Sequence, residues 1–275
     1  MKQILKKIIG PDTLYRLGAL RLQIKSIPYR LGKGVVCPIC ETTYKAFMPF
    51  RYRKNAYCPT CKSLERHRYI YLTLRDRLGF YAPPCKKVLH FAPDICLIPS
   101  IKQNPHIEYV TADYMTSFTS SITVQPDYVM SIDDIQFDDN SFNVVIAIGI
   151  LVMVPEDTKA MREVLRVLKP GGYAVFHDPI NLELTYSFSD ATLAPAEKQS
   201  LYHGHDQRWY YGADYADRLR AQGFEVEMIY MPNRLITKNT VFRQKRRSIL
   251  PKRKHENIVL HQCFRACYQW PSAVC

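Results

Sequence analysis

Glycine is scarce in this chain of 275 residues, which contains 11 glycines and shows no repeating period. A repeat array needs such a period and is therefore excluded. Long apolar runs are missing as well. The longest, residues 144–155, is interrupted by Gly149 and is shorter than the about 20 residues that a membrane-spanning helix needs. The amino-terminal residues contain no long apolar stretch, so we expect no secretory signal.

What the chain does contain is enough apolar material for a sizeable core, 47% of its residues, so disorder of the whole chain is excluded. Its net charge of +13 is unevenly distributed. Residues 78–233 hold 11 basic and 20 acidic side chains, and the flanks hold 27 basic and 5 acidic ones. Basic flanks suit an anionic partner such as nucleic acid, anionic lipid or a phosphorylated carrier, or they simply form a solvated surface.

Four of the nine cysteines form two C-x-x-C pairs, Cys37/Cys40 and Cys58/Cys61, separated by 17 residues. Two such turns facing each other supply four thiolates in the tetrahedral arrangement that structural Zn²⁺ prefers. The alternatives are two disulfides or a thioredoxin-like redox pair. Neither pair lies in a βαβ pattern, and we expect no secretion, so the spacing favours a closed, structural zinc site in a small ribbon.

The residues around the cysteine pairs suggest two further features. Aromatic and basic residues alternate over 50–54, a pattern that could hold a phosphate backbone or simply belong to a solvated hairpin. After the last cysteine, Ser63 is a candidate N-cap for a helix whose apolar residues continue to Leu78. We expect this helix to link the ribbon to the next domain.

The middle of the chain alternates between strand and helix patterns. The segment 155–168 has its apolar residues at helical spacing and ends at Lys169-Pro170-Gly171-Gly172, where proline and glycine stop a helix. Short links between such elements predict an α/β fold with a doubly wound, Rossmann-like parallel sheet. The predicted strands are 88–91, 107–111, 128–132, 142–148, 173–177 and, near the end, 257–264.

Ligands of such sheets bind at the carboxyl ends of the strands. Asp113 comes directly after the second predicted strand, where an acidic side chain can accept hydrogen bonds from ribose hydroxyls. The alternative is a solvated loop aspartate.

Two sets of motifs carry a resemblance to a known family. Residues 139–145 and 165–172 resemble the class I S-adenosylmethionine-dependent methyltransferases. Residues 64–68 and 88–94 resemble a bacterial subgroup with a zinc ribbon before the methyltransferase core, often associated with surface-glycan biosynthesis. The likeness covers about residues 35–230. It implies a basic helical arm (1–32), a zinc ribbon (33–64), a linker helix (65–82), a methyltransferase core (83–232) and a basic segment with a last strand and tail (233–275).

The resemblance also implies positions for S-adenosylmethionine. The turn after the first strand would contact the methionine part, Asp113 the ribose, the segment around Ser131 the adenine, and Gly149 would line the pocket beneath the sulfonium. The implied cofactor residues are His90, Phe91, Ala92, Pro93, Asp94, Asp113, Tyr114, Ser131, Ile132, Asp133, Ile148 and Gly149.

The chain departs from the family pattern at several of these positions. Ala92-Pro93 stands where the usual first turn is rich in glycine, and Ser131 stands where an aspartate usually lies beside the adenine. The subgroup's His-Val-Leu-Glu-His element is replaced by residues 149–153, and its Asp-His-Val-Arg element by residues 206–209. A protein that keeps the fold without catalysis therefore stays open as an alternative.

A general base for methyl transfer must lie near the transferred methyl group. His177 and Asp178 end the fifth predicted strand, and His205 and Asp206 lie in a loop that could close over the acceptor. The alternative is that each histidine is a hydrogen-bonded structural residue. These four are the predicted catalytic residues.

The expected function is O-methylation of a sugar or lipid-linked glycan in the cytoplasm, with S-adenosylmethionine and structural Zn²⁺ as cofactors. An RNA methyltransferase that uses the ribbon and the basic flanks remains an alternative. Residues 1–10 form a short basic amphipathic pattern, which suits either the inner membrane face or packing on the protein. The sequence leaves the oligomeric state open.

Overall fold

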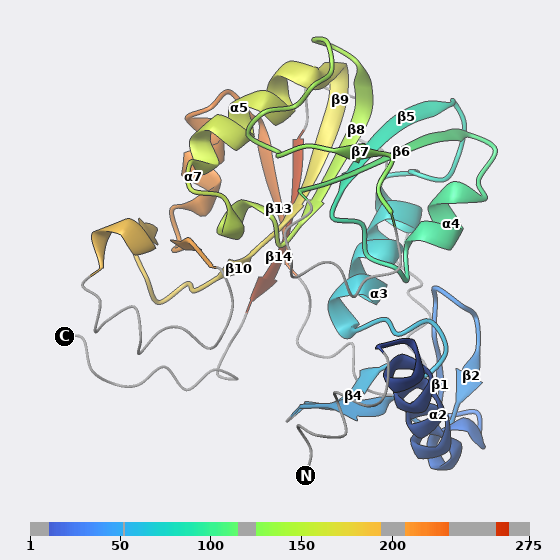
Figure 1. Ribbon diagram of the computed structural model, residues 1–275. Coiled ribbons are helices and arrows are strands. Elements are labelled where there is room, and N and C mark those ends of the chain that lie inside the picture. The colour runs from blue at the N-terminus through green and yellow to red at the C-terminus, as the bar shows by residue number, and fades with distance from the viewer. Residues whose placement is uncertain (1–10, 52, 115–124, 194–206, 231–256, 264–275) are drawn as a thin grey trace. The chain divides into compact units, whose positions relative to one another are not determined.

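The computed structural model describes residues 11–51, 53–114, 125–193, 207–230 and 257–263, and the chain divides into two compact units (Figure 1). The smaller unit holds the described residues up to Thr73, and the larger unit holds those from Leu74 onward. This boundary falls inside the predicted linker helix 65–82. No helix within the described ranges is long and apolar enough to cross a bilayer.

The described part of the smaller unit contains two helices and two short antiparallel hairpins. Its predicted helical arm is present as a helix from Pro11, and residues 1–10 lie outside the described ranges. Gly34 passes so close to the next hairpin that a Cβ there would lie 2.2 Å from the Lys45 carbonyl oxygen. The elements are α2 (Pro11–Arg30), β1 (Val35–Val36), β2 (Thr43–Tyr44), β3 (Met48–Phe50), β4 (Arg53–Tyr57) and α3 (Glu65–Leu72), with β1 paired to β2 and β3 paired to β4.

The helix after the last cysteine begins differently from the prediction. Its N-cap is Leu64, whose backbone N–H donates to Nδ1 of His67 at 3.1 Å, so the predicted cap at Ser63 is wrong. Ser63 is instead fully buried beside the cysteine sulfurs. A wide helical turn, η1 (Thr73–Arg77), follows α3 and carries the chain close to the predicted end at Leu78.

The larger unit contains an eight-stranded sheet in which every described strand pair is parallel. The order along the sheet is β10-β14-β9-β8-β5-β6-β7, and β13 also pairs with β14. This is the predicted Rossmann-like sheet. Its strands are β5 (Lys86–Phe91), β6 (Ile107–Asp113), β7 (Tyr128–Val129), β8 (Phe142–Ile148), β9 (Leu168–His177), β10 (Pro179–Ile180), β13 (Val226–Tyr230) and β14 (Asn257–Cys263).

Helices α5 and α7 contribute buried side chains to the main core on one face of the sheet (Figure 1). Met161 and Val164 of α5 and Leu219 of α7 are fully buried there, together with Val145 and Phe176 from the sheet. The described helices and short elements of this unit are α4 (Ile98–Lys102), η3 (Leu151–Met153), α5 (Asp157–Val167), η4 (Asp190–Thr192), α7 (Tyr215–Arg220) and a two-stranded antiparallel sheet of β11 (Phe188–Ser189) and β12 (Trp209–Tyr210).

Four element boundaries test the sequence prediction. The helix predicted over 155–168 is confirmed, and so is the last strand, which the structure ends at Cys263. The strand predicted to begin at Tyr173 begins earlier, because Leu168 already pairs with Phe142 before an irregularity in register. The strand predicted over 128–132 ends at Val129, since Ser131 to Asp134 form a turn.

Candidate functional site

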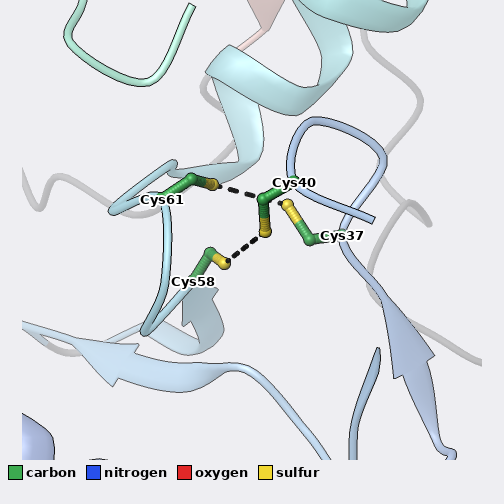
Figure 2. Close-up of side chains that lie close together, drawn as sticks. All are labelled: Cys37, Cys40, Cys58 and Cys61. Atoms are coloured by element: carbon green, nitrogen blue, oxygen red, sulfur yellow. Dashed lines mark hydrogen bonds between the residues drawn. The ribbon is translucent and has the colours of Figure 1, made fainter. Parts of the chain in front are cut away.

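The four ribbon cysteines converge in the smaller unit, two from the turn between β1 and β2 and two from the turn after β4 (Figure 2). All four sulfurs lie within 4.8 Å of one another. The sulfurs of Cys37 and Cys61 are 3.6 Å apart, and those of Cys40 and Cys58 are 3.7 Å apart. Cys37 and Cys58 are fully buried.

The same backbone turn is used twice to aim the sulfurs inward. The carbonyl of Cys37 accepts a hydrogen bond from the amide of Glu41 at 2.8 Å, and the carbonyl of Cys58 accepts one from Lys62 at 3.0 Å. Glu41 and Lys62 both have positive φ angles, +55° and +64°. Each C-x-x-C pair therefore closes one tight turn, which places its two sulfurs on the same side.

This sulfur geometry fits a tetrahedral metal ion. Zn–S bonds of about 2.3 Å place tetrahedral sulfurs about 3.8 Å apart, close to the two observed separations. A disulfide needs about 2.05 Å between sulfurs, so the four cysteines form no disulfide. Hydrogen bonding between the crowded thiols raises the pKa of Cys37 to about 11 and lowers the pKa of Cys58. Only a cation would let all four ionise together.

A buried arginine lies beside this cluster. The Arg68 guanidinium donates to the carbonyls of Ser63 at 2.9 Å and Ala56 at 3.0 Å, and its carbon lies 4.0 Å from the ring centre of Phe47. Burial lowers the pKa of Arg68, and the cysteine charges oppose that effect. Four thiolates around Zn²⁺ carry a net charge of about −2, so a buried cation at this place is electrostatically favourable.

In the larger unit, the predicted cofactor residues meet at the carboxyl edge of the sheet. Phe91 of β5 pairs with Ala112 of β6 and with Ala147 of β8. One residue further along, Ile148 of β8 pairs with His177 of β9. The next residues along the chain are Ala92, which directly follows β5, and Asp113, which is the last residue of β6. Register therefore places Asp113, Ala92, Ile148 and His177 in one row across four adjacent strands.

The alternation of side chains decides which of these residues share a face. Phe91, Ala112, Ala147 and Phe176 all belong to the core covered by α5 and α7. Because successive side chains of a strand point to opposite faces, the next residues of β6, β8 and β9 point to the other face. These are Asp113, Ile148 and His177, and His90 of β5 lies on that face as well.

Two turns at this edge adopt left-handed backbone conformations. Ala92 has φ +42° although it is not a glycine, and its amide donates to the Ala112 carbonyl at 2.8 Å. Gly149 has φ +70°, and its amide donates to the His177 carbonyl at 2.7 Å. Such a conformation strains an alanine and leaves glycine unstrained, and strained residues cluster at binding sites. Ala92 stands in the turn where the resembled family has glycine.

Asp113 is half-buried at the end of β6. Burial raises the pKa of its carboxyl group, and a hydrogen bond with the backbone of Tyr114 opposes this. A carboxylate that has lost part of its water benefits from further donors, such as a pair of ribose hydroxyls. Tyr114 itself is 64% exposed.

The predicted adenine segment forms a tight turn. The Ser131 hydroxyl donates to the Asp133 carboxylate, and the Asp134 amide donates to the Ser131 carbonyl at 3.2 Å. Ile132 is 2% exposed and packs into the core. The predicted cofactor contact from the Ile132 side chain is therefore corrected to a supporting role beneath Ser131 and Asp133.

Two other predicted cofactor residues are also core residues. His90 is fully buried and Phe91 is 2% exposed, so their side chains offer almost no surface to a ligand and can only support the turn that follows. The Nδ1 atom of His90 is 3.0 Å from the Tyr109 hydroxyl, and burial lowers the pKa of His90 to about 4. Pro93 and Asp94 follow in the turn itself, where the Asp94 carbonyl accepts the amide of Leu97 at 2.8 Å.

The structure separates the predicted catalytic residues. His177 lies in the row at the sheet edge, 6% exposed. Asp178 is fully buried, accepts hydrogen bonds from Val152 and Tyr215, and thus holds neighbouring elements together. The prediction of Asp178 as a catalytic residue is corrected accordingly. His205 and Asp206 lie outside the described residues.

An arginine fixes the segment that follows the adenine turn. Arg166, near the end of α5, donates to the carbonyls of Ile135 and Phe137 at 2.8 and 2.9 Å. Its other donors bind both carboxylate oxygens of Glu163 at 2.8 Å, and Glu163 accepts the Ile135 amide at 3.0 Å. These contacts raise the pKa of Arg166 and lower that of Glu163. The sequence did not predict this pair, because the Arg166 contacts join α5 to a segment that lies before β8 in the chain.

Arg68 was missed for a related reason. Its position within residues 64–68 marked a family resemblance, but no sequence pattern shows that a guanidinium is buried. A charged side chain one helical turn into the element that follows Cys61 would have been the available signal.

Comparison with known proteins gives one domain match. A family model described as a methyltransferase domain matches residues 101–176, from α4 through β9. No curated protein sequence matches this chain.

Solved structures resemble the chain at low identity. A provisionally assigned methyltransferase from Bacillus halodurans is 19% identical, covering 56% of this chain and 67% of that one, with a TM-score of 0.38. The cyclase SpnF is 16% identical, covering 76% and 70%, with a TM-score of 0.45. An S-adenosylmethionine-dependent methyltransferase from Thermotoga maritima is 15% identical, covering 58% and 78%, with a TM-score of 0.35.

The domain match includes Asp113, Ser131, Ile148 and Gly149, four of the residues at or next to the carboxyl edge of the sheet. The chain therefore contains a methyltransferase domain on a Rossmann-like sheet, which supports the predicted S-adenosylmethionine-dependent methyltransferase.

Proposed function

We propose that the protein transfers a methyl group from S-adenosylmethionine to a hydroxyl of a sugar or lipid-linked glycan. S-adenosylmethionine as the methyl donor is supported by one observation, the row of Asp113, Ala92, Ile148 and His177 at one edge of the sheet. The glycan acceptor is favoured by the resemblance of residues 64–68 and 88–94 to a ribbon-bearing subgroup associated with glycan biosynthesis.

The residues at this edge fit the parts of the cofactor. Asp113 accepts hydrogen bonds from the two ribose hydroxyls, and Ser131 and Asp133 flank the adenine. The backbone of the turn from Ala92 to Asp94 faces the methionine part, and the positive φ of Ala92 supports this assignment, because strained residues cluster at binding sites. When bound, S-adenosylmethionine supplies an electrophilic methyl group.

His177 is the proposed general base. An acceptor oxygen forms its bond to the methyl carbon as the carbon–sulfur bond breaks, and the hydroxyl proton passes to the imidazole. The Gly149 amide fixes the backbone of His177 through its carbonyl, so the ring starts from a defined position at the tip of β9. Positioning the acceptor in line with the methyl group contributes most of the acceleration.

Calorimetry with S-adenosylhomocysteine tests the cofactor site. The wild-type chain should bind, and Asp113→Ala should weaken binding by about 1–3 kcal/mol because hydrogen bonds to a charged acceptor are lost. Glu108→Ala is a matched control, since Glu108 is an exposed carboxylate at the other end of the same strand. Equal affinities of the two variants would remove the ribose assignment, and no binding by the wild-type chain would remove the proposed function.

An RNA acceptor is the second candidate. The observation in its favour is Phe50, which stacks on Tyr57 and has the guanidinium carbons of Arg51 and Arg53 at 5.9 and 5.6 Å from its ring centre. Aromatic rings beside arginines bind single-stranded nucleic acid. RNA affinity that falls steeply with salt, under conditions where glycan methylation is unaffected, would favour this candidate.

We further propose that the four cysteines hold structural Zn²⁺. Their sulfur separations and the buried Arg68 support this assignment, and with four sulfur ligands the site has no open position for catalysis. Elemental analysis should find about one zinc per chain, and the variant Cys58→Ser should lose it.

The proposed acceptor also suggests where the enzyme acts. A lipid-linked glycan would place the enzyme in the cytoplasm at the inner membrane face. The basic flanks, with 27 of the 38 lysines and arginines, support an anionic partner there.

A further inference from the structure

Helix α2 carries an exposed stripe of aliphatic side chains. Leu17, Leu20, Ile24 and Ile27 lie on it, and Leu31 continues the stripe just past its end. Their exposed fractions are 50, 52, 58, 55 and 77%. The spacing of three and four residues aligns them along one side of the helix, and among the described residues none covers them.

The opposite side of α2 is the one that contacts the ribbon. Ser26 is fully buried, and Leu22 and Tyr29 are half-buried. The Tyr29 carbonyl accepts the amide of Lys45 at 2.9 Å, which joins the helix end to the segment after β2. The aliphatic stripe therefore lies on the side of α2 opposite to this contact.

Positive charge borders the stripe. Arg21, Lys25 and Arg30 are exposed on α2, and no acidic residue occurs from 13 to 33. Basic residues beside an apolar face are typical of helices that lie in the interface of an anionic bilayer, where the aliphatic stems reach the acyl chains and the charges meet lipid phosphates.

Charge argues against a second copy of the chain as the occupant. In a coiled coil with this stripe at the a and d positions, Arg21 and Arg30 occupy the flanking e and g positions. The other flanking residues with described side chains are Gln23 and Pro28, so two copies would bring basic residues together without acidic partners.

We propose that α2 is a membrane-docking helix that lies in the plane of an anionic lipid surface. It inserts the stripe Leu17, Leu20, Ile24, Ile27 and Leu31 between the lipids and places Arg21, Lys25 and Arg30 among the head groups. This inference rests on the smaller unit and is independent of the proposed acceptor. Its success or failure therefore leaves the cofactor site untouched.

Co-sedimentation of the full chain with lipid vesicles tests the proposal. The protein should bind vesicles of phosphatidylcholine containing about 30% phosphatidylglycerol and should bind pure phosphatidylcholine much more weakly. The double variant Leu20→Ser/Ile24→Ser should bind the anionic vesicles at least about tenfold more weakly, because less apolar surface is buried in the lipid. Arg21→Gln/Lys25→Gln should also weaken binding and reduce its dependence on salt.

The matched control is Val36→Ser/Leu182→Ser, which removes two exposed aliphatic side chains elsewhere and should bind as the wild-type chain does. Circular-dichroism spectra and thermal unfolding midpoints should match those of the wild-type chain for all three variants, which shows that they are folded. Unchanged vesicle binding by Leu20→Ser/Ile24→Ser would overturn the proposal, as this would assign lipid binding to other basic segments. A wild-type dimer that this variant converts to a monomer, without lipid binding, would overturn it in favour of a second copy.

Discussion

The hydroxyl of Tyr215 donates a hydrogen bond of 2.8 Å to the carboxylate of Asp178 inside the larger unit. Both side chains are buried, at 1% and 0% exposure, and burial raises the pKa of Asp178 to about 7. The other Asp178 oxygen accepts the Val152 amide at 3.3 Å. The Asp178 carboxylate thus joins helix α7 and the turn after Gly149 to the end of β9, next to His177.

Asp178 and His90 should shift the pH dependence of stability in opposite directions. The pKa of Asp178 is raised in the folded state, so its contribution to stability is complete below the unfolded value of 3.8 and is lost as pH rises through about 7. The pKa of His90 is lowered from 6.5 to about 4, so its contribution is present above 6.5 and is lost as pH falls. Between about pH 4 and pH 7, Asp178 therefore lowers the free energy of unfolding as pH rises, and His90 raises it.

Denaturant unfolding, followed by tryptophan fluorescence across this pH range, measures both effects. In Asp178→Asn, where only the histidine of this pair titrates, the free energy of unfolding should rise with pH. In His90→Gln it should fall with pH, and the wild-type chain should lie between the two. Slopes of the same sign in both variants would contradict this assignment.

Arg166→Gln should weaken binding of S-adenosylhomocysteine by about tenfold, because the segment 135–140 loses its hydrogen bonds to a charged donor. Arg166→Lys should not restore affinity, since an ammonium cannot bridge Glu163 and two carbonyls at once. A merely structural role would lower affinity for all nucleosides alike. We expect instead a reduced preference for S-adenosylhomocysteine over S-inosylhomocysteine, measured by competition.

The control for Arg166 is Arg162→Gln, one turn earlier on the same helix, where the guanidinium donates to the side-chain oxygen of Gln222 at 3.2 Å. It should bind both ligands as the wild-type chain does. Wild-type affinity and selectivity in Arg166→Lys would contradict this prediction, because a positive charge alone would then be sufficient for ligand binding.

Ala92→Gly should raise the free energy of unfolding by up to about 1 kcal/mol, because glycine adopts a positive φ without strain. The converse change, Gly149→Ala, should lower it by about 1 kcal/mol, although no atom lies within 4 Å of the new Cβ. Ala213→Gly, at a position without positive φ, should be destabilising as a control. Chemical denaturation measures all three, and a loss of stability in Ala92→Gly would argue against backbone strain at this turn.

Arg68→Met should make the zinc-loaded ribbon release its metal about 10–100 times faster to a colorimetric chelator. Methionine fills similar space but cannot balance the negative charge of a four-thiolate zinc centre or bond to Ser63 and Ala56. Arg66→Met, two residues earlier and only partly buried, serves as the control. Equal release rates in the two variants would remove the electrostatic role of Arg68.

Sequence alone predicted the parts whose signals are local. The cysteine spacing predicted that four sulfurs would converge. The apolar patterns predicted the strands 142–148 and 257–264 and the helix 155–168, because each type of element has its own spacing of apolar residues along the sequence. The same patterns located Asp113 and His177 at strand ends. The methyltransferase class followed from short motifs in residues 139–145 and 165–172, which a domain match now supports.

Only the tertiary structure showed how deeply each side chain is buried and which residues it contacts. Burial assigns supporting roles to Asp178, predicted as catalytic, and to Ile132 and His90, predicted as cofactor contacts. The side on which a residue packs depends on register with strands far away in sequence. The Arg166 and Arg68 contacts likewise join segments separated by many residues, so no local pattern contains them. Composition and periodicity determined which elements form, and long-range packing determined which of their groups remain free for chemistry.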